Sequence, residues 1–190
     1  MKKIGILGGT FDPPHIGHLI IADQILHKCG LDEIRFMPNY IPPHKEKQTN
    51  TTVKDRLHML ELAIEGHDRF KIETIELERK EKSYTYDTMV ILKEKEPDHQ
   101  FFFLIGGDMV DYLPKWHRID ELMEIVQFIA VHRPTYEGKT EYPVKFVDIP
   151  EIHLSSSVIR QKIGNGESVK YLLKDSIIQY IEENGLYGKR

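Results

Sequence analysis

The sequence predicts an α/β protein with a doubly wound parallel sheet. Short apolar runs alternate with segments of helical periodicity along the chain. Two of these runs, Lys3–Leu7 and Gln100–Ile105, each end directly in a pair of glycines. Alternating strands and helices favour parallel pairing with right-handed crossovers. Such sheets bind ligands at the carboxyl ends of their strands, which is where these glycine pairs stand.

The amino-terminal segment is predicted to form a strand–helix–strand unit. After the first strand, Lys3–Leu7, apolar residues recur at helical spacing from Ile16 to Cys29, and Gly30 marks the end of that helix. Glu33–Met37 then has the composition of a second buried strand. This order of elements is a βαβ unit, which requires parallel pairing of its two strands.

From residue 39 onward, the pattern continues with a proline-containing polar loop over 39–50 and then further helices and strands. The predicted helices are Val53–Glu65, Thr85–Lys95, one from about Ser156, and Lys174–Asn184. The first of these is amphipathic, with a predicted apolar face of Val53, Leu57, Leu60 and Ile64. The predicted strands are Phe70–Leu77 (one or two), Gln100–Ile105, Ile125–Val131 and Val144–Val147, and Glu78–Lys82 is predicted to be a solvated turn. We expect one domain over 1–190, with a helical part from about 154 to 190.

Composition narrows the functional classes. The chain has 190 residues, 40% of them hydrophobic and 29% charged, as in an ordinary globular protein. A net charge of −4 argues against a broad nucleic-acid-binding surface. The longest apolar run, Phe101–Ile105, is far shorter than the ~20 residues that span a bilayer, so we expect no membrane partner. Gly8, Gly9 and Asp12 interrupt the apolar start, which argues against a signal peptide.

The chain has one cysteine, Cys29, so an internal disulfide is impossible. This is compatible with a reducing compartment, and we expect a cytoplasmic protein.

Residues 8–19 (GGTFDPPHIGHL) carry most of the chemical information. Glycines allow a phosphate to approach the backbone closely, and the helix behind them offers unpaired N–H groups and the positive end of its dipole. His15 and His18 are three residues apart, so at a helix start they project to one side and can donate hydrogen bonds to phosphate oxygens. Two other interpretations stay open. The histidines can cap and pack the helix, or they can bind zinc, for which no third ligand stands at standard spacing.

A second motif, Leu154–Arg160 (LSSSVIR), has the pattern of a capped helix start. Capping alone explains its serines. Arg160 lies about one turn into the predicted helix, however, and can face the same anion as the cap. Taken together, the two motifs present two helix amino-termini that can bind one polyphosphate. The P-loop and the glycine-rich dinucleotide fingerprint are both absent from the sequence.

The two motifs together resemble the nucleotidyltransferase superfamily with the His-x-Gly-His signature, and within it the bacterial nicotinate-nucleotide adenylyltransferases. The narrower resemblance is carried by residues 42–45 (PPHK), 83–86 (SYTY), 105–108 (IGGD) with Leu113 and Trp116, and 132–134 (HRP). It covers essentially the whole chain and implies a Rossmann-like nucleotidyltransferase fold. The implied reaction joins ATP and nicotinate mononucleotide into nicotinate adenine dinucleotide and pyrophosphate, a step of NAD biosynthesis. The implied cofactor is Mg²⁺, bound through phosphates and water without a protein ligand.

The resemblance also implies roles for individual residues. The implied catalytic residues are His15, His18, Lys45 and Arg160. The implied ATP-binding residues are Gly8, Gly9, Thr10, Phe11, His18, Gly106, Asp108, Ser155, Ser156 and Arg160. The implied mononucleotide-binding residues are His44, Lys45, Tyr84, Thr85, Asp108, Trp116, His117 and Arg133. Four of these have ordinary alternatives: solvation for Lys45, helix capping for Asp108, core packing for Trp116 and a surface ion pair for Arg133.

Other functions remain open from the sequence. One is a sister transferase that acts on phosphopantetheine or forms a cytidylyl product, against which Trp116, Lys45 and the chain length argue. Another is a non-catalytic nucleotide sensor, against which His15, His18 and Arg160 argue. A zinc-site protein is the third. The sequence does not decide between an acid and an amide at the pyridine ring, and a homodimer is plausible for a small α/β enzyme.

Overall fold

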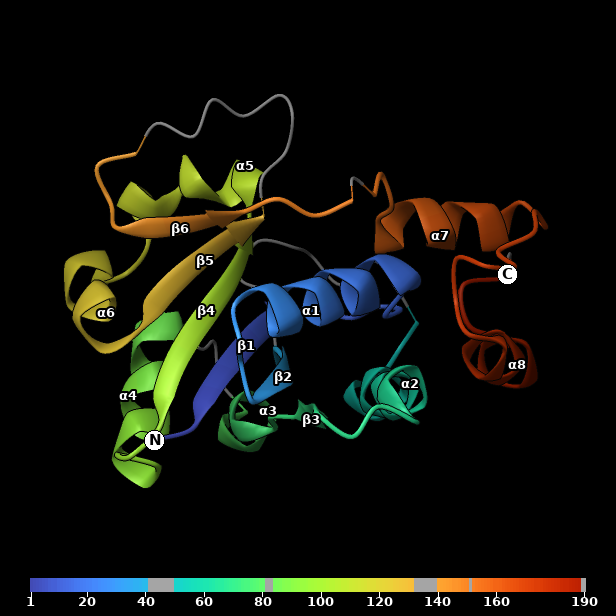
Figure 1. The fold of residues 1–190 in the computed structure, drawn as a ribbon. Coiled ribbons are helices and arrows are strands. Elements are labelled where there is room, and N and C mark those ends of the chain that lie inside the picture. Colours follow the sequence, from blue (N-terminus) through green and yellow to red (C-terminus); the bar gives the residue numbers. More distant parts are fainter. Residues whose placement is uncertain (41–49, 81–83, 132–139, 151, 189–190) are drawn as a thin grey trace.

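In the part of the chain that the structure describes, six parallel strands form one sheet at the centre of the molecule (Figure 1). This computed structural model describes residues 1–190 except 41–49, 81–83, 132–139, 151 and 189–190. The strands are β1 Lys3–Gly9, β2 Glu33–Pro38, β3 Phe70–Ile72, β4 Gln100–Gly106, β5 Gln127–Val131 and β6 Val144–Val147. Their order in the sheet is β3-β2-β1-β4-β5-β6, and each neighbouring pair is parallel. The predicted fold class is therefore confirmed, and the chain reverses its direction of progress across the sheet between β1 and β4.

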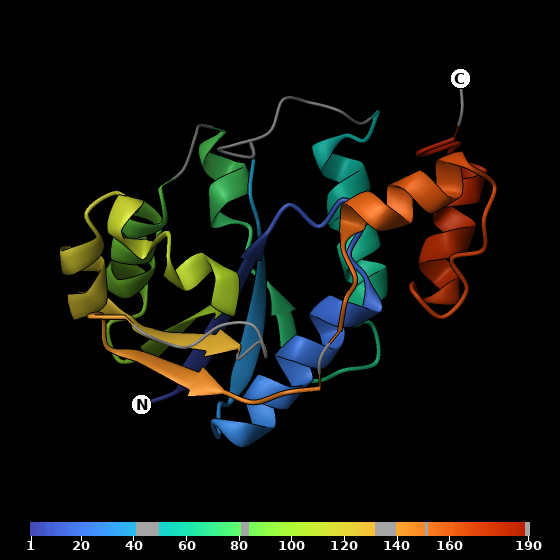
Figure 2. The same cartoon turned by 90° about the horizontal axis from the view of Figure 1, so that it is seen from above.

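Helices cover both faces of the sheet. Within the described residues they are α1 Ile16–Lys28, α2 Val53–Ile64, α3 Ile75–Arg79, α4 Thr85–Lys95, α5 Gly107–Val110, α6 Ile119–Ile125, α7 Ser156–Gly164 and α8 Asp175–Glu183, with a 3-10 turn at Leu113–Lys115. Side chains of α1, α2, α7 and α8 share one buried cluster, and those of α3 to α6 share the other. α8 lies beside α2 at one end of the molecule (Figures 1 and 2). None of these described helices has the length and apolar character needed to cross a bilayer.

Side chains of the central strands alternate between the two clusters. Phe101 and Phe103 pack on the α4 side of the sheet, whereas Phe102 and Leu104 pack on the α1 side. Because helices cover both faces of the sheet, the sequence of β4 is a continuous apolar run and does not alternate between apolar and polar residues. A Cβ atom at Gly5 in β1 would lie 2.5 Å from a methyl carbon of Ile34, so only glycine fits there without a shift. The apolar runs in the sequence thus follow from the two-sided burial of the sheet.

Some sequence predictions were wrong in detail. The strand predicted over Phe70–Leu77 ends at Ile72, and α3 follows it, taking in the start of the segment 78–82 that was predicted to be a turn. Residue Ile125 was predicted to begin a strand, but it ends α6, and β5 starts two residues later. The bounds of the short elements between β4 and β5 were not predicted, because three to seven residues contain too few turns to show helical periodicity.

Helix α2 buries a different face from the one predicted. The predicted apolar face shares only Leu60 with the residues that the structure buries in this helix, which are Arg56, Met59, Leu60 and Ala63. Arg56 belongs to the buried face because its guanidinium reaches three backbone carbonyl groups, which offset the cost of removing its charge from water. The buried face of α2 therefore contains a charged residue, which a prediction based on apolar residues alone would assign to the exposed face.

Candidate active site

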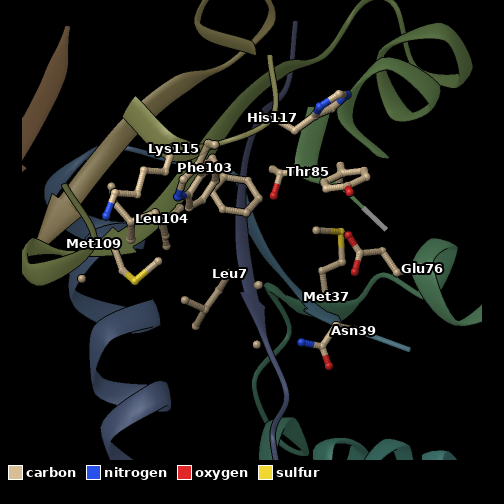
Figure 3. Close-up of a pocket in the computed structure, with 16 residues that line it drawn as sticks. Leu7, Met37, Asn39, Glu76, Thr85, Phe103, Leu104, Met109, Lys115 and His117 are labelled. Atoms are coloured by element: carbon tan, nitrogen blue, oxygen red, sulfur yellow. The ribbon is translucent and has the colours of Figure 1, made fainter. Parts of the chain in front are cut away.

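A cavity of about 440 Å³ opens at the carboxyl ends of β1 and β4, at the point where the strand order reverses (Figure 3). The predicted site residues that line it are Gly8, Gly9, Tyr84, Thr85, Gly106, Trp116 and His117. Lining residues that were not predicted include Met37, Asn39, Glu76, Met109 and Lys115. The topology therefore brings together residues that are about a hundred positions apart in the sequence, as expected for an open α/β sheet.

Gly106, the last residue of β4, lines the cavity beside the side chain of Asp108. A Cβ atom at Gly106 would lie 2.6 Å from the Oδ1 atom of Asp108, so a side chain at position 106 would require the Asp108 carboxylate to move. Asp108 is exposed and lies in the first turn of α5, whose N-cap is Gly106. The alternative role of Asp108 as the cap of this helix is therefore wrong. Its carboxylate lies at the same strand end as the cavity.

Aromatic rings form one wall of the cavity. Trp116 packs edge-on against Phe103 and Phe128, with ring centroids 5.8 Å apart in both pairs. Its indole is only partly buried, so part of it lines the cavity while the rest joins the core. The rings of Tyr84 and His117 are 4.5 Å apart, and both residues are exposed at the opening. This arrangement can receive a flat ring between aromatic surfaces.

The amino-terminus of α4 opens toward the same cavity. Tyr84 is the N-cap of this helix, and its side chain makes no capping hydrogen bond. The N–H groups of the first turn have no partner within the helix itself, and together with the helix dipole they favour a negative group. Thr85, the first residue of α4, lines the cavity. A carboxylate on a bound ring is therefore the kind of group that this helix start can bind.

The two predicted histidines form a stacked pair at the start of α1. Their ring centroids are 3.7 Å apart, and the backbone N–H of His15 donates to Nδ1 of His18 over 3.1 Å. Because Nδ1 accepts this bond, a neutral His18 carries its proton on Nε2, which can then donate to a ligand. His15 is buried, and its Nδ1 has no hydrogen-bond partner among the described residues.

Burial keeps both rings neutral at pH 7. Desolvation lowers the pKa of His15 to about 4. Desolvation, with a smaller contribution from the charge of His15, also lowers the pKa of His18 well below its ordinary value. In the ligand-free protein these histidines therefore act as neutral donors. A bound polyphosphate would favour their protonated form by placing negative charge nearby.

Helix α7 begins against the turn that precedes α1. The hydroxyl of Ser156 donates to the carbonyl of Pro13 over 2.8 Å, and Nη1 of Arg160 donates to the carbonyl of Asp12 over 2.9 Å. Ser155 is the N-cap and accepts from the N–H of Val158 over 3.3 Å, so the predicted capping role is confirmed. The two helix amino-termini that the sequence singled out are therefore directly joined by hydrogen bonds, although 143 residues separate Ser156 from Pro13.

Residues that sequence reasoning missed hold this turn in place. The carboxylate of Asp12 is buried and accepts hydrogen bonds from Thr51 over 2.8 Å and from Tyr187 over 2.5 Å. Arg56 donates to the carbonyls of Thr10 and Asn39, both over 2.7 Å. The turn after β1 is thus tied to α2, to the end of β2 and to the carboxyl-terminal residues. Asp12 belongs to the sequence motif, but its role could not be seen without its distant partners.

Comparison with known proteins identifies the family. A cytidylyltransferase-like family model matches residues 6–162. A probable nicotinate-nucleotide adenylyltransferase from Geobacillus thermodenitrificans is 56% identical over 190 residues, which are 100% of this chain and 88% of that protein. The nicotinate-nucleotide adenylyltransferase of Bacillus subtilis is 51% identical over 187 residues, covering 98% of this chain and 99% of that one. The chain belongs to the nicotinate-nucleotide adenylyltransferase family.

This chain also has the same fold as solved structures of adenylyltransferases. A nicotinic acid mononucleotide adenylyltransferase from Plasmodium falciparum, complexed with NaAD, matches with a TM-score of 0.82 at 24% sequence identity, covering 98% of both chains. A putative nicotinate-nucleotide adenylyltransferase from Vibrio parahaemolyticus matches with a TM-score of 0.74 at 19% identity, covering 100% of this chain and 98% of that one. The resemblance inferred from the motifs is therefore confirmed at the level of family and fold.

Most of the predicted site residues of this family member lie in one of two places in the structure. One group lines the cavity, and the other surrounds the start of α1 and α7. The ring of Phe11 lies in the core at 2% exposure, so only its backbone can serve a ligand. His44, Lys45 and Arg133 lie outside the described residues, as do the whole motifs at 42–45 and 132–134 and the first residue of the motif at 83–86. Among the described residues, no group of three or more His, Cys, Asp or Glu is arranged to hold a metal ion.

Proposed function

We propose that this chain transfers the adenylyl group of ATP to nicotinate mononucleotide, giving nicotinate adenine dinucleotide and pyrophosphate. The observation that carries the proposal is the hydrogen-bonded junction of two helix amino-termini, α1 and α7, at the same sheet edge as an aromatic-walled cavity. The junction suits the triphosphate of ATP, and the cavity suits a pyridine ring. The curated relatives described above, which are 51% and 56% identical, carry the name of this activity.

The chemistry needs no protein base. The phosphate of nicotinate mononucleotide has a second pKa of about 6, so near pH 7 it is largely a dianion and already a nucleophile. One of its oxygens forms a bond to the α-phosphorus of ATP, and the bond from that phosphorus to the bridging oxygen of the β-phosphate breaks. The electron pair leaves with pyrophosphate. The chain contributes positioning and stabilisation of developing charge, through Nε2–H of His18, the guanidinium of Arg160 and the N–H groups of both helix starts.

We propose that Mg²⁺ arrives with ATP. The donors around the junction are N–H groups, hydroxyls, imidazoles and a guanidinium, and these suit phosphate oxygens more than a hard cation. The ion would therefore be held by phosphate oxygens and water. When bound it would neutralise charge on the phosphates of ATP.

The mononucleotide would occupy the cavity. In this arrangement its pyridine ring stacks against Trp116, and its carboxylate accepts hydrogen bonds from the N–H groups at the start of α4, near Tyr84 and Thr85. Asp108, at the end of β4, would accept hydrogen bonds from ribose hydroxyls. His44, Lys45 and Arg133 remain predicted ligands of the mononucleotide phosphate.

Replacing Trp116 with alanine is expected to weaken mononucleotide binding by about tenfold, which is the size of one lost ring-stacking contact. The dissociation constant of ATP should stay within about twofold of wild type, because the indole lies on the cavity wall and not at the junction of α1 and α7. Titration calorimetry with each ligand checks both values. Trp116→Phe keeps a ring and serves as the control. An equal loss for ATP would contradict the placement of the two sites.

A pyrophosphate-release assay tests the function itself. Nicotinate mononucleotide, nicotinamide mononucleotide and phosphopantetheine would each be combined with ATP or with CTP. We expect the fastest release from ATP with nicotinate mononucleotide. Release that requires phosphopantetheine as the acceptor, or that occurs with CTP and not with ATP, would assign the chain to a sister transferase. A protein that binds ATP but releases no pyrophosphate with any acceptor would be a nucleotide sensor.

Three broader expectations remain proposals. One is that residues 1–190 work as one domain, which is supported by the hydrogen bonds from Arg160 and Tyr187 to the turn after β1. The others are a homodimer, which is plausible for an enzyme of this size, and a cytoplasmic location.

A further inference from the structure

A buried carboxyl group lies in the cavity beside the proposed site for the pyridine substituent. Glu76 of α3 is 6% exposed and lines the cavity together with Met37, Tyr84 and Thr85. Figure 3 shows its carboxyl group directed toward the Met37 side chain. An acidic side chain is therefore buried in the same cavity that is proposed to receive an acidic substrate.

One hydroxyl group connects Glu76 to the start of α4. Thr88 Oγ1 donates to Glu76 Oε1 over 3.0 Å, and the same oxygen lies 3.2 Å from the carbonyl oxygen of Tyr84. Thr88 is fully buried. A hydroxyl has one proton, so it cannot fully serve both acceptors at once. Gain or loss of a proton at Glu76 therefore acts directly on the first turn of α4.

The surroundings of Glu76 favour its uncharged form. Burial raises the pKa of this carboxyl to about 7, against the smaller lowering effects of the Thr88 hydrogen bond and the Arg79 charge. Arg79, on the same helix, is the cation that acts on Glu76, and its Nη1 atom is buried without a hydrogen-bond partner among the described residues. The α4 helix presents the Thr88 hydroxyl, and β2 presents the Met37 thioether. Lys115 and His117 are other cavity-lining groups that carry or can carry charge.

We propose that Glu76 determines the choice between nicotinate and nicotinamide, and that its protonated form favours the acid. The proposal rests on the proposed function, because it concerns the ring substituent of the same mononucleotide. A protonated Glu76 can donate a hydrogen bond to the nicotinate carboxylate and does not repel it. An ionised Glu76 repels that carboxylate and can accept a hydrogen bond from the NH₂ group of an amide. The preference for the acid should therefore fall as Glu76 loses its proton.

The test is the ratio of kcat/KM for nicotinate mononucleotide to kcat/KM for nicotinamide mononucleotide, measured from pH 6 to pH 8.5. Both substrates carry the same phosphate, and both react with the same ATP. Titration of those groups, and of the histidines at the junction, therefore largely cancels in the ratio. In the wild-type protein we expect the ratio to fall about tenfold or more across this range, as the carboxyl passes from neutral to charged.

Two variants, with one matched control, separate specificity from folding. Glu76→Gln keeps a neutral group, so its ratio should change less than about twofold over the same range. Glu78→Gln, on the exposed side of the same helix, is the matched control and should follow the wild-type curve. Thr88→Val removes a hydrogen bond that favours the ionised form, so it should move the midpoint of the ratio to higher pH. Circular dichroism and thermal melting show which variants are folded.

The outcomes are distinct. A flat wild-type ratio would overturn the role of Glu76, and so would a folded Glu76→Gln variant that keeps the wild-type slope. In either case, continued pyrophosphate release with nicotinate mononucleotide would leave the proposed function intact. If Glu76→Gln does not fold, an unmoved midpoint in Thr88→Val overturns the proposal. A wild-type protein that releases no pyrophosphate with either mononucleotide would instead refute the proposed function.

Discussion

Replacing His18 with alanine is expected to lower kcat by about 10²-fold or more, the scale of losing one preorganised donor to a developing negative charge. The backbone N–H of His15 occupies Nδ1 of His18, so Nε2–H is the donor that the ring offers to a ligand. Because burial keeps this ring neutral, the donor is present throughout the neutral pH range without a prior protonation step. Steady-state pyrophosphate release at saturating ATP and nicotinate mononucleotide measures the loss.

The control for this experiment lies on the same helix. His27 is exposed in the last turn of α1, and His27→Ala should leave kcat within about twofold of wild type. The His18 ring also packs edge-on against Phe11, with centroids 5.1 Å apart, so a thermal melt must show that His18→Ala is folded. A folded His18→Ala variant with near-normal kcat would remove this residue from catalysis. The stacked pair would then be a packing device, which is the alternative that the sequence left open.

The elements that the sequence predicted well are those with many turns or many consecutive apolar residues. β1, α1, β2 and β4 are of this kind, and each was predicted within about two residues of its observed ends. Their signals are local, since a strand that is buried on both faces must be apolar throughout and a packed helix must repeat its apolar residues. The order of these elements then restricts the sheet to parallel pairing. The position of the ligand site follows from that topology.

Two of the residues that the sequence did not predict, Arg56 and Glu76, are buried against partners on other elements. Arg56 can be buried because its guanidinium donates hydrogen bonds to the carbonyls of Thr10 and Asn39. Nothing in the sequence around Arg56 indicates that these two carbonyls lie beside it. Glu76 lies in the segment Phe70–Leu77 that was predicted to be a strand, but α3 carries it, and Thr88 of α4 donates a hydrogen bond to its buried carboxyl group. Such polar burial is compensated by tertiary hydrogen bonds, so no local pattern of residue types can reveal it.

Replacing Arg160 with alanine is the second large effect that we expect, a fall in kcat/KM for ATP of about 10²-fold or more. One nitrogen of the guanidinium is anchored on the carbonyl of Asp12, which fixes the group at the turn beside His15 and His18. Nη2 donates to the hydroxyl of Ser157 over 3.2 Å. The N–H groups that these two bonds do not use belong to a planar fork that matches phosphate oxygens. Arg160→Lys keeps the charge but loses the fork, so it should recover only part of the lost activity. Initial rates at varied ATP and saturating mononucleotide give these values.

A double-variant cycle tests whether the two helix starts act on one triphosphate. If His18 and Arg160 stabilise the same transferring group, the loss in His18→Ala/Arg160→Ala should be clearly smaller than the product of the two single losses. Lys162→Ala provides the control. It removes a partly exposed cation on the same helix as Arg160, one that pairs with Glu167, and its loss should multiply with that of His18→Ala. Fully multiplicative losses for His18 and Arg160 would mean that the two groups act independently. The hydrogen bonds between α7 and the turn before α1 would then serve the fold and not a shared phosphate site.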